Sequence, residues 1–514
     1  MELDREICER ARLARDARFD GRFFIGVTST GVYCRPVCPA RSPKPKNVLY
    51  FPSAAAAAEA GFRPCLRCRP EASPGTPAWL GASASVSRAL KLIGESALDG
   101  GGVDQLAARL GIGSRHLRRL FLRYVGATPV AVAQTRRVHF AKKLIDETSL
   151  SMAQIAMASG FGSIRRFNAI FQKFYQRAPG DLRRVSPSKT STNSLISHIG
   201  NYRLRLAYRP PYDWASLIEF LAARAIPGVE TVSPGEYRRT IGLDGFTGEI
   251  SVRPVEGRHC LELNIRYPDP AALFRIVERV RGIFDLGADP AEAAAHLKKD
   301  LHLKTALRSY PGLRVPGCWD GFEIAVRAIL GQQVSVKAAT TIAGRLAAKF
   351  GSPETGGAGV LFPTASALAE ADLSRVGLTG QKIRSIRELA AAVNRGEIPF
   401  DRSIDTEQFE KRITAIPGIG PWTAQYIAMR LGEPDAFPAA DLYLRGVAAQ
   451  ADAWRPWRAY AAMYIWKCSP QPDSKKSKRE KIKPQAVRNG VKHVRRHDEL
   501  LLSGKPDRHV ADRG

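Results

Sequence analysis

The chain has 514 residues, and its 78 Lys and Arg against 49 Asp and Glu give a formal net charge of +29 at pH 7. A chain of this length exceeds one hydrophobic core, so we expect about three to four domains. The positive excess favours a polyanionic partner, either nucleic acid or an acidic membrane. The sequence contains no apolar run of about 18 residues, which excludes a transmembrane helix, and its charged start is unlike a signal peptide. We therefore expect a DNA-bound protein of the cytoplasm, at the bacterial nucleoid.

Composition and periodicity divide the chain into five segments and predict a multidomain α+β protein. Residues 1–75 are short, Pro-rich and Cys-containing, and residues 83–186 have helical periodicity. In 200–312 the runs YRLRLAY, RRTIGL, EISVRPV and CLELNI alternate as strands do, and SLIEFLAARA reads as an amphipathic helix, which predicts a small α/β domain. Residues 313–468 are helical again, and the Lys/Arg-rich tail 469–514 is expected to be disordered.

Four cysteines in the first segment have the spacing of a tetrahedral zinc site. Cys34 and Cys38 form C-x3-C, and Cys65 and Cys68 form C-x2-C. Spacing alone favours a structural zinc knuckle. Zinc-bound thiolates remain nucleophilic, however, and the Arg, Pro and Lys residues around these cysteines suit a site that meets a phosphate. The cysteines without close-pair spacing are expected to be structural thiols: Cys8, Cys260, Cys318 and Cys468.

The wider sequence DGRFFIGVTSTGVYCRPVCPAR…GFRPCLRCRPE resembles the N-terminal domain of the Ada family over most of 15–72. The resemblance implies that the four cysteines bind zinc. It also implies that Cys34 accepts a methyl group from a methylphosphotriester in DNA, once per protein molecule. Methylation of one ligand removes a negative charge from the centre, and we hypothesise that this reduced repulsion tightens DNA binding.

Two helix-turn-helix patterns follow, at VDQLAARLGIGSRHLRRLFLRYVG (103–126) and MAQIAMASGFGSIRRFNAIFQKFY (152–175). Their apolar residues at helical spacing are expected to be core: Leu106, Leu110, Leu117 and Phe121. Polar residues at the outward positions of the second helices suit contacts with phosphates and base edges: Ser114, Arg115, His116, Arg118, Arg119, Ser163, Arg165, Arg166 and Asn168. The alternative is an ordinary helical bundle with a basic, solvated face.

The doubled motif resembles the AraC family of transcriptional activators, and the spacing of Leu120, Tyr124, Gly126 and Pro129 contributes to the resemblance. The resemblance implies that two recognition helices enter successive major-groove segments of promoter DNA. It also implies RNA polymerase as a partner. No feature of the chain demands a dimer, so we expect a monomer.

In the C-terminal half, ITAIPGIGPWTAQYIAMR (413–430) predicts two helices joined by a hairpin, Pro417–Gly420. Gly418 and Gly420 let backbone amides approach a phosphate at the start of the second helix. A single carboxylate, Asp441, follows in AFPAADLYLRG and by itself reads as a helix N-cap. Hairpin and carboxylate together resemble the helix-hairpin-helix glycosylase superfamily, in which the aspartate is catalytic.

Residues 200–468 are similar to the AlkA family of 3-methyladenine DNA glycosylases II, notably in PGLRVPGCWDGFEIAVRAILGQQVSV and WRPWRAYAAMYIW. The resemblance implies that Asp441 is the catalytic carboxylate and that Trp422, Tyr426 and Trp466 surround the flipped base. An N-alkylated purine is cationic, so electron-rich indoles attract it, and Asp441 stabilises the oxocarbenium-like sugar. The alternative for each aromatic is plain core packing.

The residue at 422 bears on the kind of activity, and the chain departs from the AlkA family at three places. These are Gln333, the segment after Asp441, and the basic tail after Cys468, which has no family counterpart and is expected to add non-specific DNA affinity. Trp422 stands where bifunctional lyases have a lysine, so we predict a monofunctional glycosylase that leaves an intact abasic site. Gln333 stands where the AlkA family has a leucine wedge; it can fill the gap left by the flipped base and hydrogen-bond the orphaned partner. The segment between Asp441 and Trp454 is shorter than in the family, as if one helix were missing.

The sequence thus predicts an alkylation-damage response protein: a base-excision glycosylase fused to a methylphosphotriester-sensing transcriptional activator. The alternative is a transcription regulator whose altered glycosylase module binds DNA without excising bases. The two differ in whether excision survives the shortened segment after Asp441.

Overall fold

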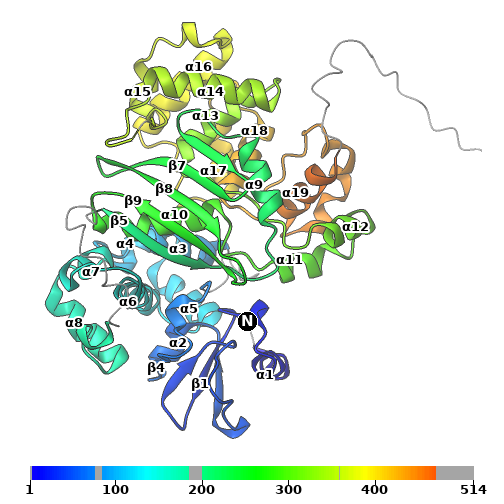
Figure 1. Ribbon diagram of the computed structural model, residues 1–514. Helices are drawn as coiled ribbons and strands as arrows, with labels where there is room; N and C mark the ends of the chain where they lie inside the picture. Colours follow the sequence, from blue (N-terminus) through cyan, green and yellow to red (C-terminus); the bar gives the residue numbers. More distant parts are fainter. Residues whose placement is uncertain (1–2, 76–83, 184–199, 358, 470–514) are drawn as a thin grey trace, which may run out of the picture. The chain divides into compact units, whose positions relative to one another are not determined.

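The computed structural model describes residues 3–75, 84–183, 200–357 and 359–469 (Figure 1). The predicted basic tail, apart from Ser469, lies outside the described residues, as do most of the linkers on either side of the helix-turn-helix segment. Within the described residues, no helix is both long and apolar enough to cross a bilayer.

The N-terminal domain is built on a small four-stranded sheet in the order β3-β1-β2-β4. Strand β2 lies between β1, its antiparallel neighbour, and β4, to which it is parallel. The elements are α1 (Arg5–Leu13), β1 (Phe24–Val27), β2 (Val32–Cys34), β3 (Val48–Phe51), α2 (Ala54–Glu59) and β4 (Arg63–Pro64). Because Cys34 is the last residue of β2, the sheet fixes the first of the four paired cysteines.

Six α-helices follow among the described residues 84–183, and both predicted helix-turn-helix pairs are confirmed. They are α3 (Ala84–Gly94), α4 (Val103–Arg109), α5 (Ser114–Val125), α6 (Pro129–Glu147), α7 (Met152–Ala158) and α8 (Ile164–Tyr175). Gly111 and Gly160 occupy the two turns with φ of +70° and +75°, a backbone region that glycine enters without steric cost. The predicted core residues Leu106, Leu117 and Phe121 are at most 1% exposed. Helix α6 joins the two pairs.

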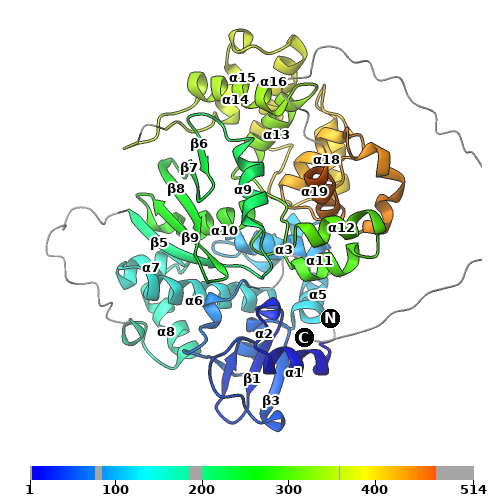
Figure 2. The same ribbon diagram turned by 45° about the vertical axis from the view of Figure 1, so that its right-hand side comes forward.

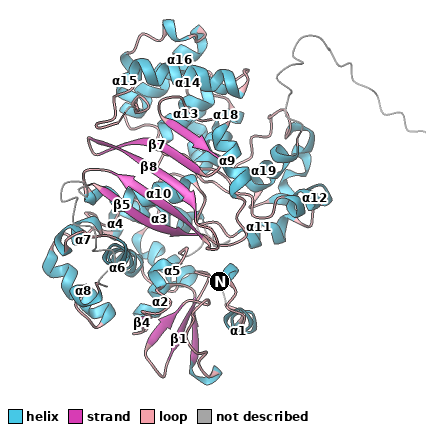
Figure 3. Ribbon diagram, in the orientation of Figure 1, coloured by secondary structure: helices cyan, strands magenta, loops and turns pink. Residues whose placement is uncertain are grey.

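A five-stranded antiparallel sheet in the order β5-β9-β8-β7-β6 comes next, and Figure 3 shows its strands in magenta. The elements are β5 (Asn201–Ala207), α9 (Trp214–Ala222), β6 (Glu230–Ser233), β7 (Glu236–Leu243), β8 (Phe246–Pro254), β9 (Cys260–Arg266) and α10 (Leu273–Ile283). All four predicted strands are present. The alternation of apolar and polar residues did not predict β6. Its four residues, ETVS, include only one that is buried.

The sheet, with α9 and α10, shares one apolar cluster with the second helix-turn-helix pair. Leu144 of α6 and Phe167 of α8 belong to the same buried cluster as Leu204 of β5 and Ile276 of α10. Burial of this apolar surface joins segments that the sequence places in separate domains.

The remaining elements are almost all helical and pack around a separate apolar cluster. They are α11 (Pro290–Leu297), α12 (Leu301–Ser309), α13 (Gly321–Gly331), α14 (Val336–Phe350), α15 (Ala365–Glu370), α16 (Gly380–Asn394), α17 (Thr406–Thr414), α18 (Pro421–Arg430), the 3-10 helix η7 (Arg445–Trp454) and α19 (Arg458–Cys468). Figure 2 shows α18 and α19 side by side. The fold therefore matches the predicted multidomain α+β architecture.

Candidate metal centre and candidate active site

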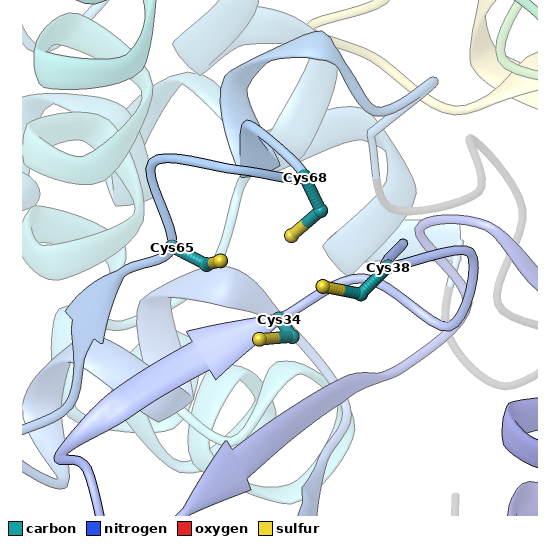
Figure 4. Close-up of side chains that lie close together, drawn as sticks. All are labelled: Cys34, Cys38, Cys65 and Cys68. Atoms are coloured by element: carbon teal, nitrogen blue, oxygen red, sulfur yellow. The ribbon is translucent and has the colours of Figure 1, made fainter. Parts of the chain in front are cut away.

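The four cysteines converge at one point of the N-terminal domain. Cys34 ends β2, Cys38 lies in the loop after it, and Cys65 and Cys68 lie in the turn after β4. Figure 4 shows their side chains pointing toward one another, and the sulfur atoms all lie within 4.8 Å of one another. A tetrahedral zinc–thiolate centre with bonds of about 2.3 Å requires sulfurs roughly 3.8 Å apart. The donor set thus fits Zn²⁺, as the spacing predicted.

Arg35, next to the first ligand, ties the two cysteine pairs together. Its backbone N–H lies 3.4 Å from Sγ of Cys68, and its Nη1 donates to the backbone oxygen of Cys68 at 3.1 Å. Its Nε donates to Oδ1 of Asp20 at 2.8 Å. Donors of this kind orient metal ligands and stabilise thiolate charge.

A residue next to each cysteine pair is bonded to helix α6. Tyr33, the residue before Cys34, is fully buried and shares a 2.7 Å hydrogen bond with Nε2 of His139. Arg69, the residue after Cys68, pairs with Asp146 at 2.6 Å. Because α6 joins the two helix-turn-helix pairs, the residues next to Cys34 and Cys68 connect the metal-binding domain to the helix between the candidate recognition helices.

The outward residues of α5 and α8 lie where the sequence places them. Arg115, His116, Arg119, Arg165 and Arg166 are all exposed. Ser163 is exposed too, but its hydroxyl accepts a hydrogen bond from the Arg166 backbone N–H and caps α8. The sequence did not reveal that capping role.

The predicted hairpin lies between α17 and α18. Gly418 has φ of +85°, and a Cβ atom there would lie 2.3 Å from Oγ of Ser385. The buried Ser385 hydroxyl donates to the backbone oxygen of Pro417 at 2.6 Å. Gly420 is the N-cap of α18, and no side chain caps that helix. The first N–H groups of α18 are thus left without a side-chain acceptor, as an anion-binding helix start requires.

Asp441 lies in a turn and faces α19. Its Oδ1 accepts hydrogen bonds from Nε1 of Trp466 at 2.9 Å and from the backbone N–H of Tyr443 at 3.0 Å. The alternative of a helix N-cap is wrong, because η7 begins at Arg445 and its N-cap is Leu444. The shortened segment folds as η7, and Trp466 still reaches Asp441.

The three predicted aromatics form a continuous set on α18 and α19. The Trp422 and Tyr426 rings are stacked, with centroids 5.8 Å apart and an angle of 11° between planes. The Tyr426 and Trp466 rings are 6.4 Å apart at 54°. All three are half-buried, so part of each ring remains accessible.

Arginines that the sequence did not indicate stand beside Tyr426. Nη1 of Arg430 donates to the Tyr426 hydroxyl at 2.9 Å, and the guanidinium carbon of Arg224 lies 3.7 Å from the centroid of the Phe220 ring. Burial by itself raises the pKa of Tyr426. The guanidinium groups of Arg430, Arg224 and Arg327 outweigh burial and lower that pKa to about 8. No motif could have identified Arg224, because it follows α9, about two hundred residues before Tyr426 in sequence.

Gln333 lies in the loop between α13 and α14. Its side chain is exposed, and its backbone has φ of +58°. Non-glycine residues seldom adopt this conformation, so neighbouring contacts must hold it there.

Four protein-family models match the chain. They are the metal binding domain of Ada over 7–71, a helix-turn-helix domain over 106–185, the AlkA N-terminal domain over 203–320, and the HhH-GPD superfamily base excision DNA repair protein over 326–467.

Similar proteins span the whole chain and its separate parts. The probable bifunctional transcriptional activator/DNA repair enzyme AlkA of Mycobacterium tuberculosis is 41% identical over 500 residues, covering 94% of this chain and 100% of that protein. DNA-3-methyladenine glycosylase 2 of Escherichia coli is 35% identical over 279 residues, covering 51% of this chain and 95% of that protein. The crystal structure of the methylated N-Ada/DNA complex is 32% identical, covers 26% of this chain and 97% of that chain, and has a TM-score of 0.13.

Fold and sites thus define a helix-hairpin-helix base-excision repair protein joined to a zinc-dependent, helix-turn-helix transcriptional regulator. The chain belongs to the family of bifunctional transcriptional activator/DNA repair enzymes of the AlkA type. It combines a DNA-3-methyladenine glycosylase with an Ada-type regulator, it binds DNA, and its cofactor is Zn²⁺.

Proposed function

We propose that Cys34 accepts the methyl group of a DNA methylphosphotriester. Its thiolate attacks the methyl carbon, so that an S–C bond forms and the C–O bond breaks, and the electron pair leaves on the phosphodiester oxygen. Zinc bound by the four cysteines keeps their thiols deprotonated at neutral pH. The product thioether is stable, so the site acts once per molecule. The observation that carries this proposal is the four-sulfur cluster at the end of β2, with Arg35 beside it.

Mass spectrometry of the full chain after incubation with methylphosphotriester DNA tests the proposal. We expect one added methyl group, on the peptide that contains Cys34, and none in Cys34→Ser. A methyl group on Cys38, Cys65 or Cys68 in the wild-type protein would contradict the assignment.

For the glycosylase we propose that Asp441 is the catalytic carboxylate and that Trp422, Tyr426 and Trp466 bind the flipped base. The carboxylate stabilises positive charge as the N-glycosidic bond breaks, and it orients the water that attacks the sugar. The half-buried indoles attract a cationic alkylated base, an interaction of about 1–2 kcal/mol when desolvated. The contact between Trp466 and Asp441 supports the proposal because it brings a base-binding indole and the catalytic carboxylate into one site.

We expect excision of 3-methyladenine from DNA to fall by a factor of roughly 10²–10³ in Asp441→Asn, as when a charge-stabilising group is lost. Heat-labile abasic sites measure the rate. Equal activity of mutant and wild type would refute the assignment of Asp441. A wild-type protein that binds DNA without excising bases would instead favour the regulator alternative.

We propose further that the glycosylase is monofunctional, because Trp422 occupies the position at which a lyase needs an amine. Borohydride treatment during turnover should then trap no covalent protein–DNA adduct. A trapped adduct would show Schiff-base chemistry.

The DNA contacts proposed are the amides at Gly418 and Gly420 and the exposed residues Arg115, His116, Arg119, Arg165 and Arg166. We also propose that the regulator acts as a monomer on promoter DNA in the bacterial nucleoid. RNA polymerase is its proposed partner there. Removing one phosphate-contacting arginine should reduce the slope of log K for operator binding against log salt concentration by about one. Binding titrations over a range of salt concentrations measure this slope.

A further inference from the structure

The loop that carries Gln333 is held by a lysine from another helix. Nζ of Lys382, in the first turn of α16, donates to the backbone oxygens of Leu330 at 2.9 Å and Gln332 at 2.8 Å. These carbonyls lie at the C-terminus of α13 and have no partner within that helix. A cation is the favourable partner at this helix end.

The same loop is bonded to the hairpin. Nε2 of Gln332 donates to the backbone oxygen of Gly418 and to Oγ1 of Thr423, both at 2.9 Å. Three residues after Lys382, Ser385 donates to the backbone oxygen of Pro417. One face of α16 thus holds both the loop and the hairpin, and Gln332 joins the two.

These bonds explain why Gln333 keeps an unfavourable backbone conformation. The carbonyl of Gln332 is part of the peptide group before Gln333, and Lys382 fixes its direction. The flanking side chains of Val334 and Val336 are 41% and 42% exposed, so the loop presents apolar surface next to Gln333. A rigid, partly apolar loop suits insertion into a base stack.

We propose that Lys382 is a positioning residue for base extrusion. By fixing the carbonyls of Leu330 and Gln332, it holds Gln333 in the orientation needed to enter the space that the flipped nucleotide leaves. The proposal rests on the assignment of Gln333 as the residue that fills this gap. Lys382 therefore affects the opening of a paired substrate more than the cleavage of its glycosidic bond.

The test uses single-turnover excision by the full chain on two duplexes, with 3-methyladenine opposite thymine or opposite a stable abasic analogue. Lys382→Met should slow excision about tenfold on the paired duplex and under about threefold on the unpaired one. Lys382→Arg, which can also donate to both carbonyls, should recover most of the rate. Lys349→Met, the same change at an exposed lysine of α14, is the matched control and should leave both rates unchanged.

A double-mutant cycle with Gln333→Ala separates the possible outcomes. If Lys382 acts through Gln333, Lys382→Met adds no further loss in the Gln333→Ala background. Equal losses on both duplexes, or additive losses in the cycle, would overturn the proposal. If Gln333→Ala keeps the wild-type ratio of paired to unpaired rates, the assignment of Gln333 fails, and the inference about Lys382 fails with it.

A second measurement does not depend on cleavage. In the Asp441→Asn background, fluorescence of 2-aminopurine next to the lesion reports unstacking. Lys382→Met should reduce this signal at saturating protein, with an unchanged thermal midpoint showing that the variant is folded. An unchanged fluorescence signal would contradict a role in extrusion.

Discussion

At the scale of single residues, Trp466 has two partners with different purposes. Its indole N–H donates to Oδ1 of Asp441, and its ring lies beside Tyr426. Trp422 stacks on Tyr426 from the same helix. We propose that Trp466 orients both the carboxylate of Asp441 and the flipped base, whereas Trp422 contacts only the base.

Substituting the two tryptophans should separate these purposes. Trp466→Phe keeps an aromatic ring but removes the hydrogen bond to Asp441, so kcat should fall about tenfold. Trp422→Phe weakens base stacking and should act mainly on KM. Steady-state excision kinetics measure both constants. The assignment fails if Trp466→Phe alters KM alone.

Tyr426 should titrate near pH 8, below the ordinary tyrosine value of 10.0. Because the folded-state pKa is lowered, ionisation of Tyr426 adds stability as pH rises from about 8 to 10, and this contribution is lost as pH falls through 8. A tyrosinate absorbance step near pH 8 should be present in the wild type and absent in Tyr426→Phe. Arg224→Met should move that step to higher pH. A step that persists in Tyr426→Phe would belong to another residue.

At the scale of elements, the hairpin between α17 and α18 shows why its two glycines are not equivalent. Gly418 has a positive φ and lies against Ser385, whereas Gly420 has a negative φ and open space at its Cβ position. Only Gly418 is required by the fold; Gly420 leaves the start of α18 open.

Replacing each glycine with alanine should therefore have different consequences for stability. Gly418→Ala combines backbone strain with a clash against Ser385 and should lower the free energy of unfolding by about 1–3 kcal/mol. Gly420→Ala should change it by less than about 1 kcal/mol. Thermal or urea denaturation compares the two variants. Equal losses would mean that Ser385 moves away at little cost.

At the scale of the whole molecule, the metal centre and the candidate glycosylase site are built on separate hydrophobic clusters. The cluster around the metal centre contains Cys34, Cys65 and Cys68 with Phe23 and Ile25. The cluster under Trp466 and Tyr426 begins at Ile226 and contains none of the described residues of the N-terminal domain. Loss of the metal should thus unfold the cluster around the cysteines and leave the cluster under Trp466 and Tyr426 folded.

Zinc removal by a chelator should abolish methyl transfer to Cys34 and leave excision at the Asp441 site within about twofold of its original rate. Operator binding should weaken, because the bonds from Tyr33 to His139 and from Arg69 to Asp146 depend on the folded metal domain. Parallel assays on one preparation, with zinc restored as the control, measure all three. Loss of excision on chelation would show that the glycosylase needs the N-terminal domain.

The sequence alone determined the features that depend on local spacing. Short motifs predicted the four zinc ligands, the turn glycines Gly111 and Gly160, and the hairpin, because each needs particular residue types at fixed separations. Asp441 by itself suggested a helix N-cap, and only the family resemblance implied a catalytic role for it. Four of the five strands of the second sheet followed from alternation. Strand β6 did not, since a short exposed strand carries little pattern.

Only the tertiary structure decided which distant residues act together. Trp466 reaches Asp441 across the shortened segment, Arg224 approaches Tyr426 from the sheet domain, and Lys382 holds the loop of Gln333. These partners are separated by tens to hundreds of residues, so no local pattern marks them. Their meeting depends on how the helices pack around a shared apolar cluster, and packing is a property of the folded chain as a whole.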